Sequence, residues 1–127
     1  MTTKLITACI GAGNIGRAWA MMFARAGHEV RLHDEKPEAV SAARALIRTL
    51  LDDQKSIGLI EEEIDAVFAR IKPVASLEAA VAGAHYVQEC VYEDLELKRR
   101  VFGALDRAAP EGAILASSVS SISVATL

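Results

Sequence analysis

Three glycines near the start of the chain have the spacing of a phosphate-binding turn. Gly11, Gly13 and Gly16 form the pattern G-x-G-x-x-G within the stretch IGAGNIGRAW. In such a turn the first glycine permits a sharp bend, the second lets the backbone approach a diphosphate, and the third lets a helix lie close to a strand. Amides at the start of that helix, together with its dipole, attract the anion. On spacing alone, the pattern is equally compatible with a turn that binds nothing.

An acidic residue further along the chain favours a dinucleotide-binding role for the glycine turn. Asp34 lies eighteen residues after Gly16, at the end of the next expected strand. A carboxylate there can accept hydrogen bonds from both hydroxyls of an adenosine ribose, and it repels a 2′-phosphate. Arg31 and Lys36 are close in sequence and soften that preference slightly, although Arg31 is expected to point to the other side of its strand. The combination predicts dinucleotide binding, with NAD favoured over NADP. The alternative is that Asp34 only forms a turn.

A second polar stretch, VQECVYEDLELKRRVF, follows a later strand. Gln88 and Glu89 interrupt an apolar run, and a charge in a central strand is costly unless it is paired. Further along, Glu93 is close enough in sequence to pair with Lys98. This pair is either a solvated surface contact worth under about 1 kcal/mol or a contact beside the ribose or nicotinamide, and the spacing does not decide between the two.

A third stretch, ASSVSSIS, contains five serines in seven residues directly after the last expected strand. Their hydroxyls can hydrogen-bond a ligand, or they can cap the next helix. The pattern alone favours capping.

These residues can act together only if the elements that carry them form one sheet. Strands are expected at Leu5–Ile10, Glu29–His33, Ile71–Ser76, His85–Val91 and Ala113–Ala116. Helices are expected at Asn14–Ala26, Pro37–Lys55, Leu59–Ile71, in a short segment capped by Ser76, and from the cap Asp94 to Leu105. The alternation predicts a Rossmann-type, doubly wound parallel α/β sheet, with an extra pair of helices between the second and third strands. Ligands bind beyond the carboxyl ends of such strands, where all three stretches lie.

The composition fits one domain over residues 1–127 with a sizeable core, since 52% of the residues are hydrophobic. The net charge of −3 offers no basic face for nucleic acid or an anionic membrane, and the apolar runs are too short to span a bilayer. Cys9 and Cys90 have no metal-like spacing and are expected to be reduced core thiols of a cytoplasmic protein. Several apolar side chains of the first helix are expected to fill the core: Ile15, Ala18, Trp19, Met21, Met22 and Phe23.

The segments Gly11–Asp34 and Val87–Phe102, followed by the serine run, resemble the NAD-binding domain of the 3-hydroxyacyl-CoA dehydrogenase family, and most closely its lambda-crystallin / L-gulonate 3-dehydrogenase branch. The resemblance covers essentially the whole chain. It implies oxidation of an L-3-hydroxy acid or 3-hydroxyacyl-CoA to the 3-keto product, with hydride transfer to NAD, and a homodimer for the full-length enzyme. It also implies roles for these residues: Asn14, Ile15 and Gly16 at the pyrophosphate, Asp34 at the ribose, Glu93 and Lys98 at the cofactor, and Ser120 near the substrate hydroxyl.

The chain departs from the family pattern in three places. Val119 stands where the family usually has a threonine, and Leu50 and Ile57 stand where acyl-CoA members have a serine and a lysine that touch CoA. The second departure favours a small hydroxy acid over an acyl-CoA. The family's catalytic histidine, the general base that removes the hydroxyl proton, and its helical domain are expected beyond Leu127. This fragment is therefore expected to bind NAD without turning over alone.

Two other interpretations stay open. One is a non-catalytic NAD-binding protein, since crystallins of this family are structural proteins. The other is a related β-hydroxyacid dehydrogenase or imine reductase, which shares the glycine turn but lacks the spacing of Glu93 and Lys98.

Overall fold

The fold is one parallel sheet between two layers of helices. The structure, a computed structural model, describes residues 4–91 and 94–118. The strands are β1 (Ile6–Ile10), β2 (Glu29–His33), β3 (Ile71–Pro73), β4 (Tyr86–Glu89) and β5 (Ile114–Ser117). They pair in the order β3-β2-β1-β4-β5, every pair parallel. This order confirms the doubly wound fold. After β1 the chain adds β2 and β3 on one side of it, and then returns to add β4 and β5 on the other side.

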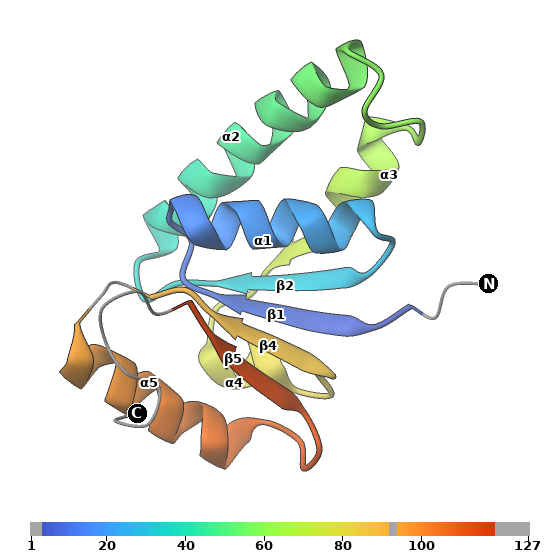
Figure 1. The fold of residues 1–127 in the computed structure, drawn as a ribbon. Coiled ribbons are helices and arrows are strands. Elements are labelled where there is room, and N and C mark those ends of the chain that lie inside the picture. Colours follow the sequence, from blue (N-terminus) through green and yellow to red (C-terminus); the bar gives the residue numbers. More distant parts are fainter. Residues whose placement is uncertain (1–3, 92–93, 119–127) are drawn as a thin grey trace.

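The helices divide between the two faces of the sheet, as Figure 1 shows. They are α1 (Asn14–Arg25), α2 (Pro37–Ser56), α3 (Ile64–Ala69), α4 (Leu77–Val81) and α5 (Leu95–Ala108). On one face α1, α2 and α3 enclose a core that includes Cys9, while on the other α4 and α5 pack against Ala8 and Ile10. Neighbouring residues of β1 thus point to opposite cores, as the pleat of a strand requires. The extra helical pair between β2 and β3 is confirmed as α2 and α3.

The buried face of α1 differs from the expected one. Ile15 and Met22 are 55% and 50% exposed, whereas the fully buried positions include Gly16 and Ala20. Trp19 and Phe23 pack on the core as expected. The apolar residues of α1 therefore predicted the wrong buried face. A helix that follows a glycine turn lies very close to the sheet, so only small side chains fit between the two.

The acidic segment before α3 is not helical, which corrects the expected helix over Leu59–Ile71. The helix starts only at Ile64, with Glu63 as its N-cap. The Lys55 ammonium accounts for this: its Nζ donates to the carbonyl oxygens of Glu61 at 2.7 Å and Glu62 at 3.0 Å. Those carbonyls bind a side chain, so the segment has a stable alternative to a helical turn.

Two predicted caps are confirmed. Ser76 accepts a hydrogen bond from the amide of Ala79 at 3.0 Å, and Asp94 accepts one from Leu97 at 3.0 Å. They fix the starts of α4 and α5, and Asp94 thereby sets the path of the chain from β4 into α5.

Within the described ranges, no helix combines the length and the apolar character needed to cross a membrane. Residues 4–91 and 94–118 also contain no group of three or more His, Cys, Asp or Glu side chains placed to hold a metal ion.

Glu29 provides a pH-dependent contribution to stability. Its carboxylate joins β2 to β3 through Lys72 at 2.9 Å and also binds Arg31 at 3.0 Å. The hydrogen bond from Lys72, followed by that from Arg31, holds the pKa of Glu29 below its usual range. A lowered pKa means that the stabilisation is present above the ordinary glutamate pKa of about 4.3 and disappears as the pH falls through the lowered value.

We therefore expect Glu29→Gln to lower the free energy of unfolding at pH 7 by about 1 kcal/mol, since the partners are partly exposed. The difference from the parent chain should shrink as the pH falls below about 4. Urea unfolding at pH 7 and at lower pH measures it, with the exposed Glu61→Gln as control. A difference that is independent of pH would show that the charge of Glu29 does not contribute.

Candidate functional site

The glycine turn combines two glycines that the fold requires with one that it does not. Gly11 has a φ of +109°, and a Cβ on it would lie 2.6 Å from the carbonyl oxygen of Cys90. A Cβ on Gly16 would lie 1.8 Å from the carbonyl oxygen of Gly11. Around Gly13, in contrast, a Cβ would meet nothing within 4 Å. Packing therefore explains Gly11 and Gly16 but not Gly13. We call the open space beside Gly13, at the start of α1, the cradle.

That cradle suits an anion. Gly13 is the N-cap of α1 and has no side chain, so no side-chain cap is present, and the first turn of α1 contains no acidic residue. The amides of Asn14, Ile15 and Gly16 therefore open the helix without a neighbouring carboxylate to compete for them. Backbone donors and the positive end of a helix dipole together favour a phosphate group. The three residues predicted for a pyrophosphate are thus placed where one would fit.

Asp34 is tied directly to this turn. Its Oδ2 accepts a hydrogen bond from the amide of Ala12 at 2.9 Å, and its Oδ1 accepts one from the amide of Lys36 at 2.9 Å. Because each carboxylate oxygen can accept a second hydrogen bond, the half-buried group can still bind two ribose hydroxyls. Arg31 points away, as predicted, since its guanidinium donates to Glu29 and to the carbonyl of Ala82.

Lys98 forms a buried ion pair, and its partner is Glu89. Both side chains are 0% exposed, and Lys98 Nζ lies 2.8 Å and 3.1 Å from the two carboxylate oxygens of Glu89 and 3.1 Å from the carbonyl oxygen of Val91. The alternative of a solvated surface pair is therefore wrong for Lys98. The expected partner Glu93 lies outside the described residues, as do Ser120 and Val119.

Glu89 connects three elements at the carboxyl end of the sheet. Besides Lys98 on α5, its carboxylate accepts hydrogen bonds from the amide of Val91 at 2.6 Å and from the hydroxyl of Ser117 on β5. Sequence reasoning recognised that a charge in this strand needs a partner, but it did not name Lys98. A usable signal was present, because Lys98 lies near the positive end of its helix, where a cation is unfavourable without a carboxylate.

The side chains of the first two serines of the serine run form hydrogen bonds with residues of β4. Ser117 donates to Glu89, and the Ser118 hydroxyl accepts a hydrogen bond from Gln88 Nε2 at 2.8 Å. These two hydroxyls satisfy the polar residues of β4, which is neither of the two roles expected for the run. Burial raises the pKa of the nearby Cys90 thiol, so this sulfur is a poor nucleophile at neutral pH.

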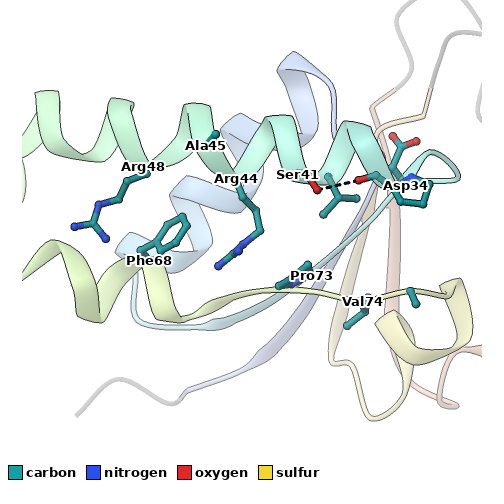
Figure 2. A pocket seen from close by; sticks show the side chains of 11 residues that line it. Asp34, Ser41, Arg44, Ala45, Arg48, Phe68, Pro73 and Val74 are labelled. Carbon is teal, nitrogen blue, oxygen red and sulfur yellow. Dashed lines mark hydrogen bonds between the residues drawn. The ribbon is translucent and has the colours of Figure 1, made fainter.

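A hollow of about 620 Å³ lies next to Asp34 (Figure 2), and none of its lining residues belongs to the glycine turn. It runs between α2 and a wall made by Phe68 of α3 and the segment 73–75. Asp34 thus borders both the cradle and this hollow.

Comparison with known proteins identifies the family. Residues 6–127 match the family model described as the 3-hydroxyacyl-CoA dehydrogenase NAD-binding domain. The chain belongs to the 3-hydroxyacyl-CoA dehydrogenase family. The resemblance seen in the sequence is confirmed, and the cofactor of this family of oxidoreductase domains is NAD.

Among curated relatives, a lambda-crystallin homolog of Bos taurus is 43% identical over 115 residues, covering 89% of this chain and 36% of that protein. An L-carnitine dehydrogenase of Streptomyces griseus is 40% identical over 113 residues, covering 89% of this chain and 33% of that protein. The chain thus spans about a third of the length of the curated relatives it matches. The first of these relatives agrees with the lambda-crystallin branch.

Solved structures agree on the fold. The 3-hydroxybutyryl-CoA dehydrogenase of Escherichia coli superposes with a TM-score of 0.90 at 31% identity, over 98% of this chain and 26% of that chain. The (S)-3-hydroxybutyryl-CoA dehydrogenase of Ralstonia eutropha gives 0.86 at 31% identity, over 95% of this chain and 43% of that chain. In this 3-hydroxyacyl-CoA dehydrogenase family domain, the glycine turn, Asp34 and the Glu89–Lys98 pair all lie at the carboxyl edge of β1, β2 and β4.

Proposed function

We propose that this chain is the cofactor-binding part of an NAD-dependent dehydrogenase that oxidises an L-3-hydroxy acid or 3-hydroxyacyl-CoA to the 3-keto product. The observation that carries the proposal is the link between Asp34 and the amide of Ala12, at 2.9 Å. It places the expected ribose acceptor against the turn whose open side lies over Gly13. A ligand that joins a diphosphate to a ribose would satisfy both at once, and NAD would supply the hydride acceptor.

The substrate favoured by the proposal is a small hydroxy acid. At the positions where acyl-CoA members carry CoA-contacting polar groups, Leu50 packs against the core and Ile57 is 73% exposed. Neither side chain can hydrogen-bond a phosphate or a pantetheine amide. In the same proposal Ser120 contacts the substrate hydroxyl and Glu93 and Lys98 border the cofactor.

A homodimer for the full-length enzyme and a cytoplasmic location belong to this proposal too. The free thiols Cys9 and Cys90 support the location, because they would persist in a reducing compartment. A non-catalytic role is the second candidate, and the similarity to proteins named lambda-crystallin is the observation that favours it.

The proposal is tested by calorimetric titration of the chain with NAD and NADP. We expect NAD to bind more tightly, because the carboxylate of Asp34 repels a 2′-phosphate. Asp34→Asn, which keeps the shape and removes the charge, should weaken NAD binding about tenfold, or about 1.4 kcal/mol, and reduce the preference for NAD. Thermal unfolding of both proteins controls for loss of the fold. A folded chain that binds neither dinucleotide, or an Asp34→Asn variant with unchanged preference, would contradict the assignment.

A further inference from the structure

The hollow beside α2 has the size and lining of a small-molecule site. Its volume of about 620 Å³ falls in the range of roughly 300–1,000 Å³ typical of ligand pockets. Most of its walls are apolar, and the lining residues with apolar side chains are Pro37, Val40, Ala45, Phe68, Pro73, Val74 and Ala75. The polar lining is confined to Asp34, Ser41, Arg44 and Arg48. Figure 2 shows the Arg44 side chain directed from α2 toward the opposite wall at Pro73.

The two arginines of the hollow differ in how their charge is balanced. Arg48 pairs with Asp65 at 2.8 Å and with Asp52 at 3.7 Å. Arg44 has no carboxylate partner among the residues that the structure describes; its guanidinium carbon lies 4.5 Å from the centroid of the Phe68 ring. Its Nε is buried and has no hydrogen-bond partner. The hollow therefore contains one positive charge that no described side chain neutralises, beside apolar walls.

The charges also set the orientation of a ligand. Asp34 lies at one end of the hollow and would repel an anion, whereas Arg44 lies two helical turns further along α2. From Pro37 to Arg44 the helix rises about 10 Å, at about 1.5 Å per residue. An anionic group at Arg44 would thus leave room for an apolar tail of about eight carbons toward Pro37 and Val74.

We propose that this hollow is a second ligand site, which binds a monocarboxylate with an unbranched apolar tail. The carboxylate is held by the Arg44 guanidinium, and the tail lies between Val40 and Val74. No residue of the glycine turn lines this hollow, so the site is distinct from the cradle at Gly13. This assignment does not depend on the identity of the dinucleotide.

Octanoate is a suitable probe, with octan-1-ol and octylamine as controls of equal tail length. Titrations followed by NMR are made on the chain alone and with saturating NAD. We expect octanoate to bind at least about tenfold more tightly than either control, because a hydrogen bond between two charged groups is about twice as strong as a neutral one. Binding should be retained in the presence of NAD, with shifts at Val40, Phe68 and Val74.

Two matched substitutions locate the charge. Arg44→Met keeps the apolar part of the side chain, so it should weaken the binding of octanoate about tenfold and leave the binding of octan-1-ol unchanged. Arg48→Met should change the binding of octanoate by less than about threefold. Equal binding of octanoate and octan-1-ol, or an Arg44→Met variant that binds octanoate normally, would overturn the proposal. Displacement of octanoate by NAD would overturn it as well, since the hollow would then belong to the dinucleotide. If NAD does not bind, the proposed function is contradicted. The titration of the chain alone with octanoate would still test the second ligand site.

Discussion

Gly16→Ala is expected to destabilise the chain by about 3 kcal/mol or more, the upper end of what overpacking of a close contact produces. The added Cβ would lie 1.8 Å from the carbonyl oxygen of Gly11, and that oxygen belongs to the backbone of the turn. Relief would require α1 to move away from β1 and would disturb the small buried residues of that helix. Denaturant unfolding of parent and variant measures the loss. An alanine variant of parental stability would show that the turn can relax without cost.

Gly13→Ala is the matched control, and it separates packing from binding. Gly13 has a φ of −80° and a ψ of −163°, which any residue can adopt, and no atom lies within 4 Å of an added Cβ. We therefore expect its stability to remain within about 1 kcal/mol of the parent, the range for an N-cap change. Its NAD affinity should fall, because the methyl group would occupy the cradle. Unchanged NAD affinity in this variant would place the diphosphate elsewhere.

Lys98→Met is expected to destabilise the chain by about 3–5 kcal/mol, because removal of one member of a buried ion pair leaves an uncompensated charge. Both side chains are 0% exposed, so water cannot screen the Glu89 carboxylate that remains. The loss is a large fraction of the roughly 5–15 kcal/mol that stabilises a typical domain. Thermal and urea unfolding would detect it directly.

The double variant Glu89→Gln/Lys98→Met should recover most of that stability. In the parent chain the amide of Val91 and the hydroxyl of Ser117 donate to different oxygens of Glu89. The glutamine removes the charge and keeps one oxygen acceptor for the amide of Val91, while its NH2 group can donate to the Ser117 hydroxyl, which is also an acceptor. Such recovery is a strongly non-additive coupling, which a double-mutant cycle measures. Additive effects of the two substitutions would show that the ion pair does not act as a unit.

The sequence by itself determined the strands and most of the helices of this protein, as well as the glycine turn, the position of Asp34 and the family. Each of these depends on local features: apolar runs, helical periodicity, caps such as Asp94 and the spacing of Gly11, Gly13 and Gly16. Alternation of strand and helix then leaves few topologies, since parallel crossovers are almost always right-handed. For the same reason the sequence placed the candidate site at the carboxyl edge of the sheet.

The tertiary structure alone decided which side chains meet there. Lys98 pairs with Glu89 rather than being a surface residue, and Arg44 faces a hollow without a carboxylate partner among the described residues. The buried face of α1 is set by its distance from the sheet, which Gly16 controls, and not by which of its residues are most apolar. Contacts of this kind join elements that are separate in sequence, so they depend on how the packed layers meet, and a local pattern of residues does not specify which side chains come together.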